Sequence, residues 1–321
     1  MPGLIGEQAL AELARLARGP GLRYRTGPFN LCLRCDNAPA IALLQRMYSH
    51  QPLLDPATDT CDFHLGLRRP RNLRRWWRPQ IELISDAQSP FEPFPRDHAF
   101  ALMEWGSNWQ IAMQAHQFLM LHSAVVEKDG YALIMPAMPG SGKSTLCAAL
   151  MLRGWRLLSD EFGLIRPLDR ALRLHPMPRP TPLKNRAIEV IRRFSPDAVM
   201  GPVFPKTRKG DVAHLAASVD SQLRAQEPAL PGWFLFPRYQ PGSALQLERL
   251  GRGWIFLKLT GNSFNYKLQG ARGFRAASEL VRRCLGYSLE YSDLDRAIAR
   301  IESLHAEIVR QRPGQATPVS G

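Results

Sequence analysis

Residues able to bind a polyphosphate stand together near the middle of the 321-residue chain, in Gly140-Ser-Gly-Lys143-Ser144. An apolar run, 131–135, precedes them, and residues of good helix propensity follow. Small residues between a strand and a helix let main-chain N–H groups close around a phosphate, which the positive helix end also attracts. In such loops the lysine reaches the β- and γ-phosphates and the next hydroxyl binds Mg²⁺. The sequence therefore predicts a nucleoside triphosphate site, with Ala137 replacing the first glycine of the usual motif.

Two carboxylates, Asp160 and Glu161, interrupt a second apolar run over 155–165. Carboxylates at a strand end beside a phosphate loop supply what Mg²⁺ and a hydroxyl nucleophile need. Asp160 follows Lys143 by 17 positions, whereas ordinary P-loop proteins place the magnesium-binding acid after at least one more β–α unit. The plainer alternative is a turn cap, but paired buried acids are costly unless a cation meets them.

The surrounding residues predict the elements that position these groups. Apolar runs 121–126 and 131–135 flank Lys128-Asp-Gly130, and Asp-Gly supplies the positive φ angles of a tight hairpin. The phosphate loop therefore leaves the second arm of a hairpin, and His122 begins the first arm. The loop helix is expected to end at Arg153-Gly154. Taken alone, His122 could equally be a core histidine that the backbone satisfies.

This compact arrangement resembles the catalytic domain of the HPr kinase/phosphorylase family over roughly residues 120–167. The motifs that carry the likeness are Leu121-His122, Gly140-Ser-Gly-Lys-Ser144, Arg153-Gly-x-Arg-Leu and Asp160-Glu161. More specifically, the chain is similar to the group called HprK-related kinase A. That second resemblance extends through Glu104-Trp105-Gly, Leu183-Lys184-Asn185, Phe236-Pro-Arg-Tyr239 and Phe264-Asn265-Tyr266.

The resemblance implies an α/β fold with a mixed, strongly antiparallel sheet, that of a P-loop kinase of the HPr kinase/phosphoenolpyruvate carboxykinase-like type. It also implies that one acid of the pair is the base toward the accepting hydroxyl and that both help to hold metal. We assign the base to Asp160 of the two. The family's second aspartate is Glu161 here, and its Leu-His-Gly is Leu121-His122-Ser123.

The candidate residues fall into three groups. The catalytic candidates are Asp160, His122, Lys143 and Glu161; the nucleotide-binding candidates are Pro139, Gly140, Ser141, Gly142, Lys143, Ser144 and Thr145; the metal-binding candidates are Ser144, Glu161 and Asp160.

The chain divides, on composition, into an N-terminal α+β domain over 1–115, a catalytic domain over 116–310 and a disordered tail over 311–321. In the first domain we expect a helix over 5–18, a strand over 28–35 and a helix over 40–48. Further strands are expected at 61–67, 76–77 and 80–85, and a strand followed by a helix over 98–120. Cys32, Cys35, Cys61 and His64 have zinc-like spacing, but positions i and i+3 of a strand face opposite ways.

The last third offers substrate-binding candidates. A predicted helix over 182–194 has Lys184 and Asn185 in its first turn, where a lysine opposes the helix dipole and so suits an anion. A predicted basic loop over 204–211 presents Lys206, Arg208 and Lys209 to a phosphoryl group, unless it is merely a solvated loop. Strands are expected over 233–239 and 254–259, and helices over 274–285 and 294–309, the last capped by Ser292.

Composition sets limits on partners. With 45% hydrophobic and 22% charged residues, no long apolar run, no visible signal peptide and five cysteines, we expect a cytoplasmic globular protein with no membrane partner. The net charge is +14, and one dense segment, 68–78, interleaves arginines with Trp76 and Trp77. Such a segment could bind nucleic acid, or be a solvated basic surface with inward-packed tryptophans, or a dock for an acidic partner. No nucleic-acid fold motif accompanies it.

The sequence therefore predicts a phosphotransferase, an HPr-kinase-like serine kinase. ATP and Mg²⁺ are the expected cofactors, and the acceptor is the hydroxyl, as in serine, of a small protein or peptide. The alternatives are a small-molecule kinase, a nucleotide-binding switch module without catalysis, and a basic nucleic-acid-binding ATPase. A homo-oligomer remains an option, because the C-terminal helices could serve subunit contacts.

Overall fold

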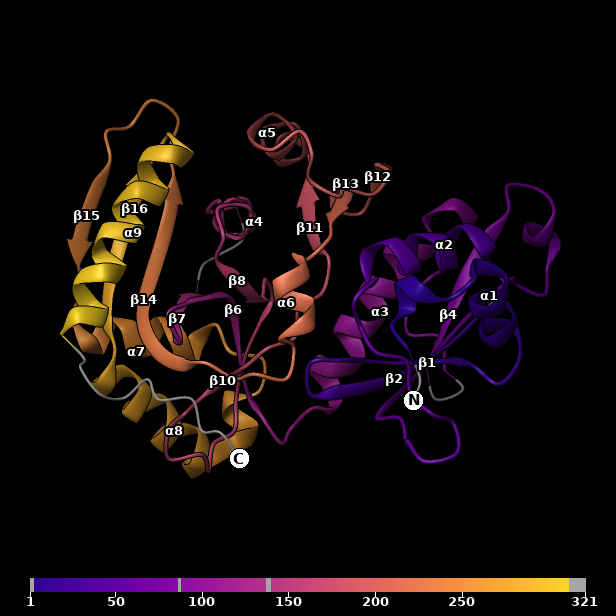
Figure 1. Ribbon diagram of the computed structural model, residues 1–321, viewed down its shortest axis with the longest axis horizontal. Helices are drawn as coiled ribbons and strands as arrows, with labels where there is room; N and C mark the ends of the chain where they lie inside the picture. The colour runs from indigo at the N-terminus through magenta and orange to yellow at the C-terminus, as the bar shows by residue number, and fades with distance from the viewer. Residues whose placement is uncertain (1–2, 86–87, 137–139, 312–321) are drawn as a thin grey trace. The chain divides into compact units, whose positions relative to one another are not determined.

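The computed structural model describes residues 3–85, 88–136 and 140–311. The architecture is mixed α/β, and the chain forms two compact units (Figure 1). The first unit comprises Met1–Ala115, Arg179–Glu189 and Asp197–Leu223, and the second comprises His116–Pro178, Val190–Pro196 and Arg224–Gly321. The segments 179–189 and 197–223 were expected in the second domain, whereas in the structure they pack with the first unit. Apart from Gln311, the predicted tail lies outside the described residues.

The first unit contains a five-stranded sheet of order β1-β2-β3-β4-β5. All neighbouring strands are antiparallel except β2 and β3, which are parallel. The strands are β1 (Leu22–Thr26), β2 (Phe29–Cys35), β3 (Phe63–Arg68), β4 (Gln80–Ser85) and β5 (Phe94–Pro95). Cys32 and Cys35 are both buried in β2.

Helices of the first unit cover this sheet. Helix α3 (Ala99–Gln114) packs on β3 and β4, and α1 (Leu10–Arg18) packs on β2 and on α2 (Ala38–Met47). Gly106 permits the close approach of α3, since a Cβ there would lie 2.5 Å from a methyl carbon of Leu83. The described part of this unit also contains the short 3-10 helices η1 (Ile5–Glu7), η2 (Leu73–Arg75) and η3 (Arg96–His98).

A buried ion pair ties a later segment to α3. Arg179 donates to the Glu104 carboxylate at 2.7 Å and to its main-chain carbonyl at 2.8 Å. The Tyr48 hydroxyl donates to the same carboxylate at 2.7 Å. Arg179 and Glu104 are 4% and 3% exposed, so each charge depends on the other for its solvation.

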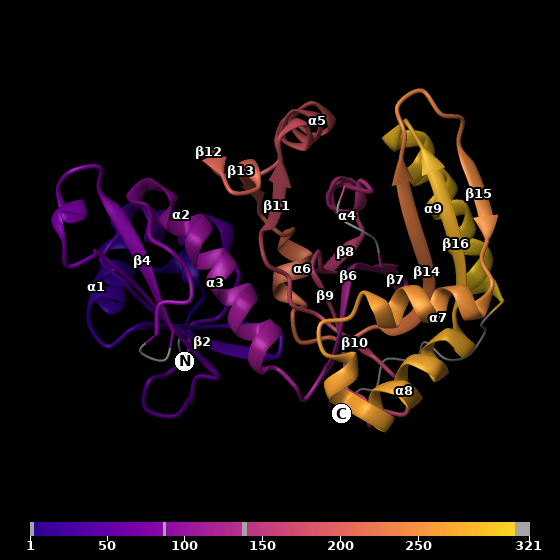
Figure 2. The ribbon, with the colours of Figure 1, turned by 180° about the vertical axis from the view of Figure 1, so that it is seen from behind.

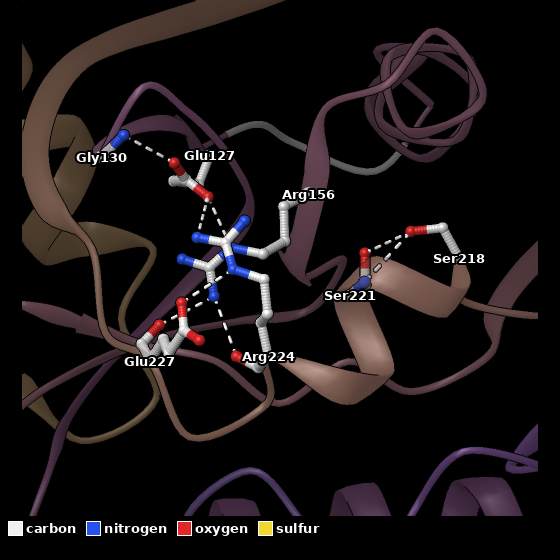
Figure 3. Close-up of polar contacts among 7 residues, drawn as sticks. All are labelled: Glu127, Gly130, Arg156, Ser218, Ser221, Arg224 and Glu227. Carbon is white, nitrogen blue, oxygen red and sulfur yellow. Dashed lines mark hydrogen bonds and ion pairs between the residues drawn. The ribbon is translucent and has the colours of Figure 1, made fainter.

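A three-stranded sheet of order β11-β13-β12 completes the first unit, with β11 (Thr181–Lys184), β12 (Phe204–Thr207) and β13 (Gly210–Leu215). The predicted helix over 182–194 is therefore wrong at its start, because Lys184 ends a strand and α5 covers Arg186–Phe194. Pro182 fits β11 because this is an edge strand. Helix α6 (Val219–Leu223) begins after Ser218, whose hydroxyl accepts the Ser221 N–H (Figure 3).

The second unit is built on an eight-stranded mixed sheet of order β10-β9-β6-β7-β14-β16-β15, with β8 also paired to β6. The three strands β7, β14 and β16 run parallel, and the other pairs are antiparallel. The strands are β6 (Leu119–Lys128), β7 (Tyr131–Pro136), β8 (Arg156–Ser159), β9 (Phe162–Ile165), β10 (Leu174–His175), β14 (Leu230–Tyr239), β15 (Gln246–Arg249) and β16 (Leu285–Tyr291).

Helices cover both faces of this sheet. Trp233 of β14 donates to His305 of α9 (Leu294–Arg310) at 3.4 Å, whereas the next residue, Phe234, packs with Ile255 and Leu280. Successive strand residues face opposite ways, so α9 lies on one face, and α7 (Arg252–Gly261) and α8 (Tyr266–Arg283) on the other. Accordingly, α9 lies in front of β16 in Figure 1, and α7 is in front in Figure 2. Helix α4 (Lys143–Leu152) contacts α9.

A buried cluster fixes the β6–β7 hairpin to β8. The Glu127 carboxylate accepts from the Gly130 N–H and from the Arg156 guanidinium, as Figure 3 shows. Arg156 also donates to the carbonyls of Arg224 and Glu227. Glu127 and Arg156 are each 3% exposed. Their pairing satisfies both charges, and it anchors the chain entering β14 next to the hairpin turn.

Several sequence predictions hold. The hairpin turn has positive φ at Asp129 (54°) and Gly130 (82°), α4 begins at Lys143 and ends before Gly154, and β2 and β4 lie where expected. The predicted helices over 40–48, 274–285 and 294–309 correspond to α2, part of α8 and α9. The helix over 5–18 is α1 with η1 before it.

Other predictions are wrong. The segment 254–259 lies in helix α7, where only one stripe, with Ile255 and Leu259, is buried; a short apolar run fits strand or helix equally. The region 98–120 is helix then strand, not the reverse. Trp76 and Trp77 lie in a loop, β16 was not expected, and the residues 204–211 form the β12–β13 hairpin. Asp293, not Ser292, caps α9 by accepting the Arg296 N–H.

Candidate functional site

The phosphate loop begins after β7 and leads into α4, as expected. Of the nucleotide-binding candidates, Pro139 lies outside the described residues, as does Ala137. Gly140 and Gly142 have φ of +86° and +89°, the left-handed region that glycine adopts at little cost. Their conformation turns the chain into the first turn of α4, where the Gly142 carbonyl accepts from the Leu146 N–H at 2.9 Å. Ser144 and Thr145 are half-buried in that turn.

Two strand ends hold this loop in place. The Tyr239 N–H, at the end of β14, donates to the Ser141 carbonyl at 2.9 Å. The Tyr291 hydroxyl, at the end of β16, lies 3.5 Å from the Gly142 carbonyl. Tyr239 and Tyr291 are paired in register, with their rings 5.8 Å apart. The loop therefore lies at the carboxyl ends of the parallel strands β7, β14 and β16, the edge at which open α/β sheets bind ligands.

Lys143 is the unusual residue of this loop. Its side chain is buried, 8% exposed, and its ammonium group has no hydrogen-bond partner among the described residues. The hydroxyl of Ser141 likewise lacks a partner within that part of the chain. A buried ammonium without a hydrogen-bond partner costs free energy, and an anion bound at this position would reduce that cost. Both atoms belong to the loop that the sequence singled out.

The acidic pair lies in the tight turn between β8 and β9. The Ser159 hydroxyl accepts from the N–H groups of Glu161, at 3.2 Å, and Phe162, at 3.0 Å. The Glu161 carbonyl accepts from the Ser123 N–H of β6 at 3.1 Å. The turn therefore sits where the partner of β6 changes from β8 to β9, and the hydrogen bonds of Ser159 shape it.

The two carboxylates have different surroundings. Asp160 is 6% exposed, whereas the Glu161 side chain is 33% exposed. Burial raises the pKa of the Cys147 thiol in α4 well above its usual value, the Asp160 charge raises it further, and Lys143 lowers it. The charges of Lys143 and Asp160 therefore both act on the Cys147 thiol, although the two residues are 17 positions apart in the sequence.

His122 lies beside Glu161. Its Nε2 is 3.3 Å from Glu161 Oε1, and its Nδ1 is 3.2 Å from Asn262 Oδ1. The amide of Asn262 donates to the His122 carbonyl, which leaves its oxygen facing the ring. Both ring nitrogens therefore lie within reach of oxygen atoms, and the imidazole is held between Glu161 and Asn262. The alternative of a core histidine satisfied by backbone does not describe this side chain.

Residues of the loop after α7, whose polar side chains the sequence predicted to be structural, contact the residues of the site. Asn265, 2% exposed, accepts from the Met120 N–H and donates to the Phe118 carbonyl, so it holds the start of β6. The Phe264 ring contacts His122 at 5.2 Å and Phe162 at 4.8 Å. The structural interpretation is correct for Asn265, whereas Asn262 and Phe264 position His122.

Mg²⁺ fits one part of this donor set. Within the described ranges, no group of three or more His, Cys, Asp or Glu side chains is arranged as a metal site, and this includes the four residues with zinc-like spacing. Mg²⁺ is usually held by one or two carboxylates together with substrate phosphates and water. Asp160, with the Ser144 hydroxyl at the start of α4, matches that requirement. Glu161 is engaged by His122.

The four basic substrate-binding candidates belong to the first unit. Lys184 ends β11. Lys206 has φ of +54°, and its N–H donates to Asp211. Arg208 forms an exposed ion pair with Glu92 at 2.6 Å, and the Lys209 ammonium lies 5.5 Å from the Trp105 ring centre. All are held by local hairpin contacts or by neighbours on the same unit.

Tyr239, Tyr291 and Cys147 are site residues that sequence reasoning missed. Tyr239 stands in one of the stretches that carried the family resemblance, and that stretch could have indicated it. Nothing local marks Tyr291, because its role depends on the pairing of β16 with β14.

None of the contacts described for this site is specific to one protein family. Comparison of the chain with models of protein families finds no match, and comparison with curated proteins finds none either.

Proposed function

We propose that the second unit is a P-loop kinase of the HPr kinase-like fold, which binds ATP with Mg²⁺ and transfers the γ-phosphoryl group to a hydroxyl. The observation that supports it best is the buried ammonium of Lys143, without a hydrogen-bond partner in the described chain, at the N-terminus of α4. A polyphosphate would supply the missing counter-charge, and two left-handed glycines already shape the loop around that position.

Asp160 is the base of the proposed reaction. Its carboxylate accepts the proton of the attacking hydroxyl, whose oxygen forms a bond to the γ-phosphorus. The bond between that phosphorus and the bridging oxygen breaks, and ADP leaves with the electron pair. Lys143 stabilises the negative charge on the transferring group. Mg²⁺, held by Ser144 and Asp160 with the phosphates, would neutralise charge on the phosphate oxygens.

In this proposal His122 and Glu161 position the turn between β8 and β9. The His122–Glu161 contact at 3.3 Å engages the Glu161 carboxylate, and Asp160 is the carboxylate of the pair that acts on the acceptor. Since Asn262 and Phe264 hold the imidazole, His122 is a positioning residue. The acceptor that the family resemblance implies is a serine of a small protein or peptide.

The test separates binding from transfer. Thermal unfolding with and without ATP and Mg²⁺ reports binding, and label from γ-labelled ATP in serine-containing acceptor peptides reports transfer. Asp160→Asn is expected to keep the nucleotide-induced rise in Tm and to lower transfer at least about 100-fold, since a positioned base contributes that much or more. Asp295→Asn, at an exposed ion pair on α9, is the matched control.

Two outcomes would contradict the proposal. Transfer that survives Asp160→Asn unchanged shows that this carboxylate is not the base. A wild-type protein whose Tm is unmoved by nucleotide at millimolar concentration has no phosphate loop at 140–144.

A further inference from the structure

The connection between β3 and β4, residues 69–79, carries a surface that the proposed function does not use. Leu73, Trp76 and Trp77 are 78%, 72% and 64% exposed. The sequence-based alternative in which the tryptophans pack inward is therefore wrong. Three large apolar side chains within five positions are thus exposed to water, and such a concentration of exposed apolar residues is typical of an interaction site.

The same loop carries uncompensated positive charge. Arg68 and Arg69 pair with Glu82 and Asp36. Four further arginines, by contrast, form no ion pair with any carboxylate of the described chain: Arg71, Arg74, Arg75 and Arg78. The loop therefore presents positive charge around an apolar tip.

The arginines lie over the tryptophan rings. The guanidinium carbon of Arg75 is 5.7 Å from the Trp76 ring centre, and those of Arg74 and Arg78 are 5.3 Å and 5.0 Å from that of Trp77. In such cation–π contacts a charged group lies over the face of the aromatic ring. The rings therefore offer their edges more readily than free faces.

The loop holds its own shape. The Asn72 side chain accepts from the Arg74 N–H at 2.9 Å, and the Leu73 carbonyl accepts from the Trp76 N–H at 3.1 Å. These bonds close the 3-10 turn η2 beneath the exposed side chains. A preformed loop loses less conformational entropy on binding than a flexible one.

We propose that this loop docks the protein on a membrane surface rich in anionic lipid. Tryptophan is enriched at the membrane–water interface, where its ring sits at headgroup level. Arginines beside it attract anionic headgroups, and an aliphatic residue such as Leu73 enters the acyl boundary. The sequence expectation of no membrane partner rested on the lack of long apolar runs, and a peripheral loop needs none.

The observations favour lipid over single-stranded nucleic acid. Bases stack on open aromatic faces, whereas two guanidinium groups lie near the Trp77 face. Leu73 would also remain in water against a nucleic acid, although it is the most exposed of the three apolar residues. A lipid interface accommodates all three apolar side chains and the charges together.

The experiment is sedimentation of the full-length protein with vesicles, without nucleotide, so that its outcome does not depend on the proposed kinase activity. Phosphatidylglycerol vesicles are expected to bind the protein, with a blue shift of tryptophan emission and quenching by brominated acyl chains. Pure phosphatidylcholine vesicles are expected to bind at least about 30-fold more weakly, because each basic residue near an anionic surface contributes about 1 kcal/mol and the loop carries several.

Variants test whether residues of this loop are responsible for the vesicle binding. Arg74→Ala/Arg75→Ala should weaken binding about 30-fold at low salt, and Trp76→Phe/Trp77→Phe should abolish most of the quenching. The matched controls are Arg296→Ala/Arg310→Ala, at exposed arginines of α9, and Leu268→Ala, at an exposed leucine of α8. Thermal unfolding checks that all variants fold.

Three results would overturn the proposal. They are no vesicle binding, binding that the loop variants leave unchanged, and tight binding of a single-stranded oligonucleotide that anionic vesicles do not compete.

Discussion

Tyr291, the last residue of β16, presses its hydroxyl against the main chain of Gly142. The hydroxyl is 3.5 Å from the Gly142 carbonyl oxygen, and a Cβ on Gly142 would lie 2.9 Å from it. The same Cβ would lie 2.9 Å from the Cβ of Tyr239. The phosphate loop therefore fits against the ends of two strands that come more than 90 positions later in the chain.

Gly142→Ala is expected to destabilise the protein more than Gly140→Ala. Both positions have positive φ, which costs an alanine about 1 kcal/mol or more. Position 142 adds two contacts under 3.0 Å, whereas a Cβ at position 140 would meet no atom of the described residues within 4 Å beyond its chain neighbours. Urea unfolding should give about 2–4 kcal/mol for Gly142→Ala and about 1 kcal/mol for Gly140→Ala. Equal losses would show that Tyr239 and Tyr291 do not confine the loop.

Lys143→Met is expected to have opposite effects with and without nucleotide. Without nucleotide the variant should be more stable by about 1–2 kcal/mol, since it removes a buried ammonium that lacks a hydrogen-bond partner. With ATP and Mg²⁺ it should lose most of the ligand-induced stabilisation, which is about 2.7 kcal/mol at 100 times Kd for the wild type. Calorimetry with and without nucleotide measures both. A variant that loses stability in both conditions would place the ammonium in a satisfied environment.

Breaking the pair between Arg179 and Glu104 should be costly. Glu104→Leu removes the acceptor of a guanidinium that is 4% exposed, so we expect a loss of about 3–5 kcal/mol on urea unfolding. Glu104→Leu/Arg179→Met leaves no buried charge and should recover part of that loss. Arg15→Met, at an exposed ion pair with Glu12, is a surface control expected to change stability by less than about 1 kcal/mol. A double variant as unstable as the single one would mean that packing, not charge, dominates.

Acid should destabilise the protein through His214. This ring is fully buried against Phe100 and Phe204, and burial, helped by the Arg179 charge, lowers its pKa to about 3 from 6.5. As the pH falls below 6.5 the unfolded chain binds a proton that the folded chain does not. Stability therefore falls with decreasing pH, by up to about 1.4 kcal/mol per pH unit for this group.

The window for that effect lies between pH 6.5 and about 3. His175, whose pKa burial lowers to about 4, adds a second contribution between pH 6.5 and 4. Urea unfolding at pH 4.5, 5.5 and 7 should show a shallower slope for His214→Phe than for the wild type. His116→Gln, at an exposed position, should keep the wild-type slope. An unchanged slope in His214→Phe would assign acid sensitivity to other groups.

Local chemistry made the core of the site predictable. Asp-Gly specified the hairpin turn, small residues before Lys143 specified the loop, and the short spacing to Asp160 followed from one helix and one strand. Each of these signals acts within a few residues. The positions of His122 and Glu161 follow as well, because β6 pairs with β9 directly after the acidic turn.

Features that depend on distant pairing could not be read from the sequence. Lys184 looked like a helix start because Pro182 precedes it, but β11 is an edge strand that tolerates proline. The composition of residues 254–259 is typical of a strand. In the structure they lie in helix α7, which buries one stripe of side chains against β6 and β16. The exposure of Trp76 and Trp77 likewise reflects a lack of neighbours, which no local pattern encodes.

The salt bridge between Glu104 and Arg179 sets an order of events during synthesis on the ribosome. The two residues are 75 positions apart, a delay of roughly 4–15 s at ordinary elongation rates of about 5–20 residues per second. The first unit is complete only when Leu223 has emerged. By then the hairpin, the loop helix and the acidic turn have already left the ribosome. The nascent N-terminal segment must therefore wait, with the Glu104 carboxylate still without its arginine, while the segments of the proposed kinase site emerge.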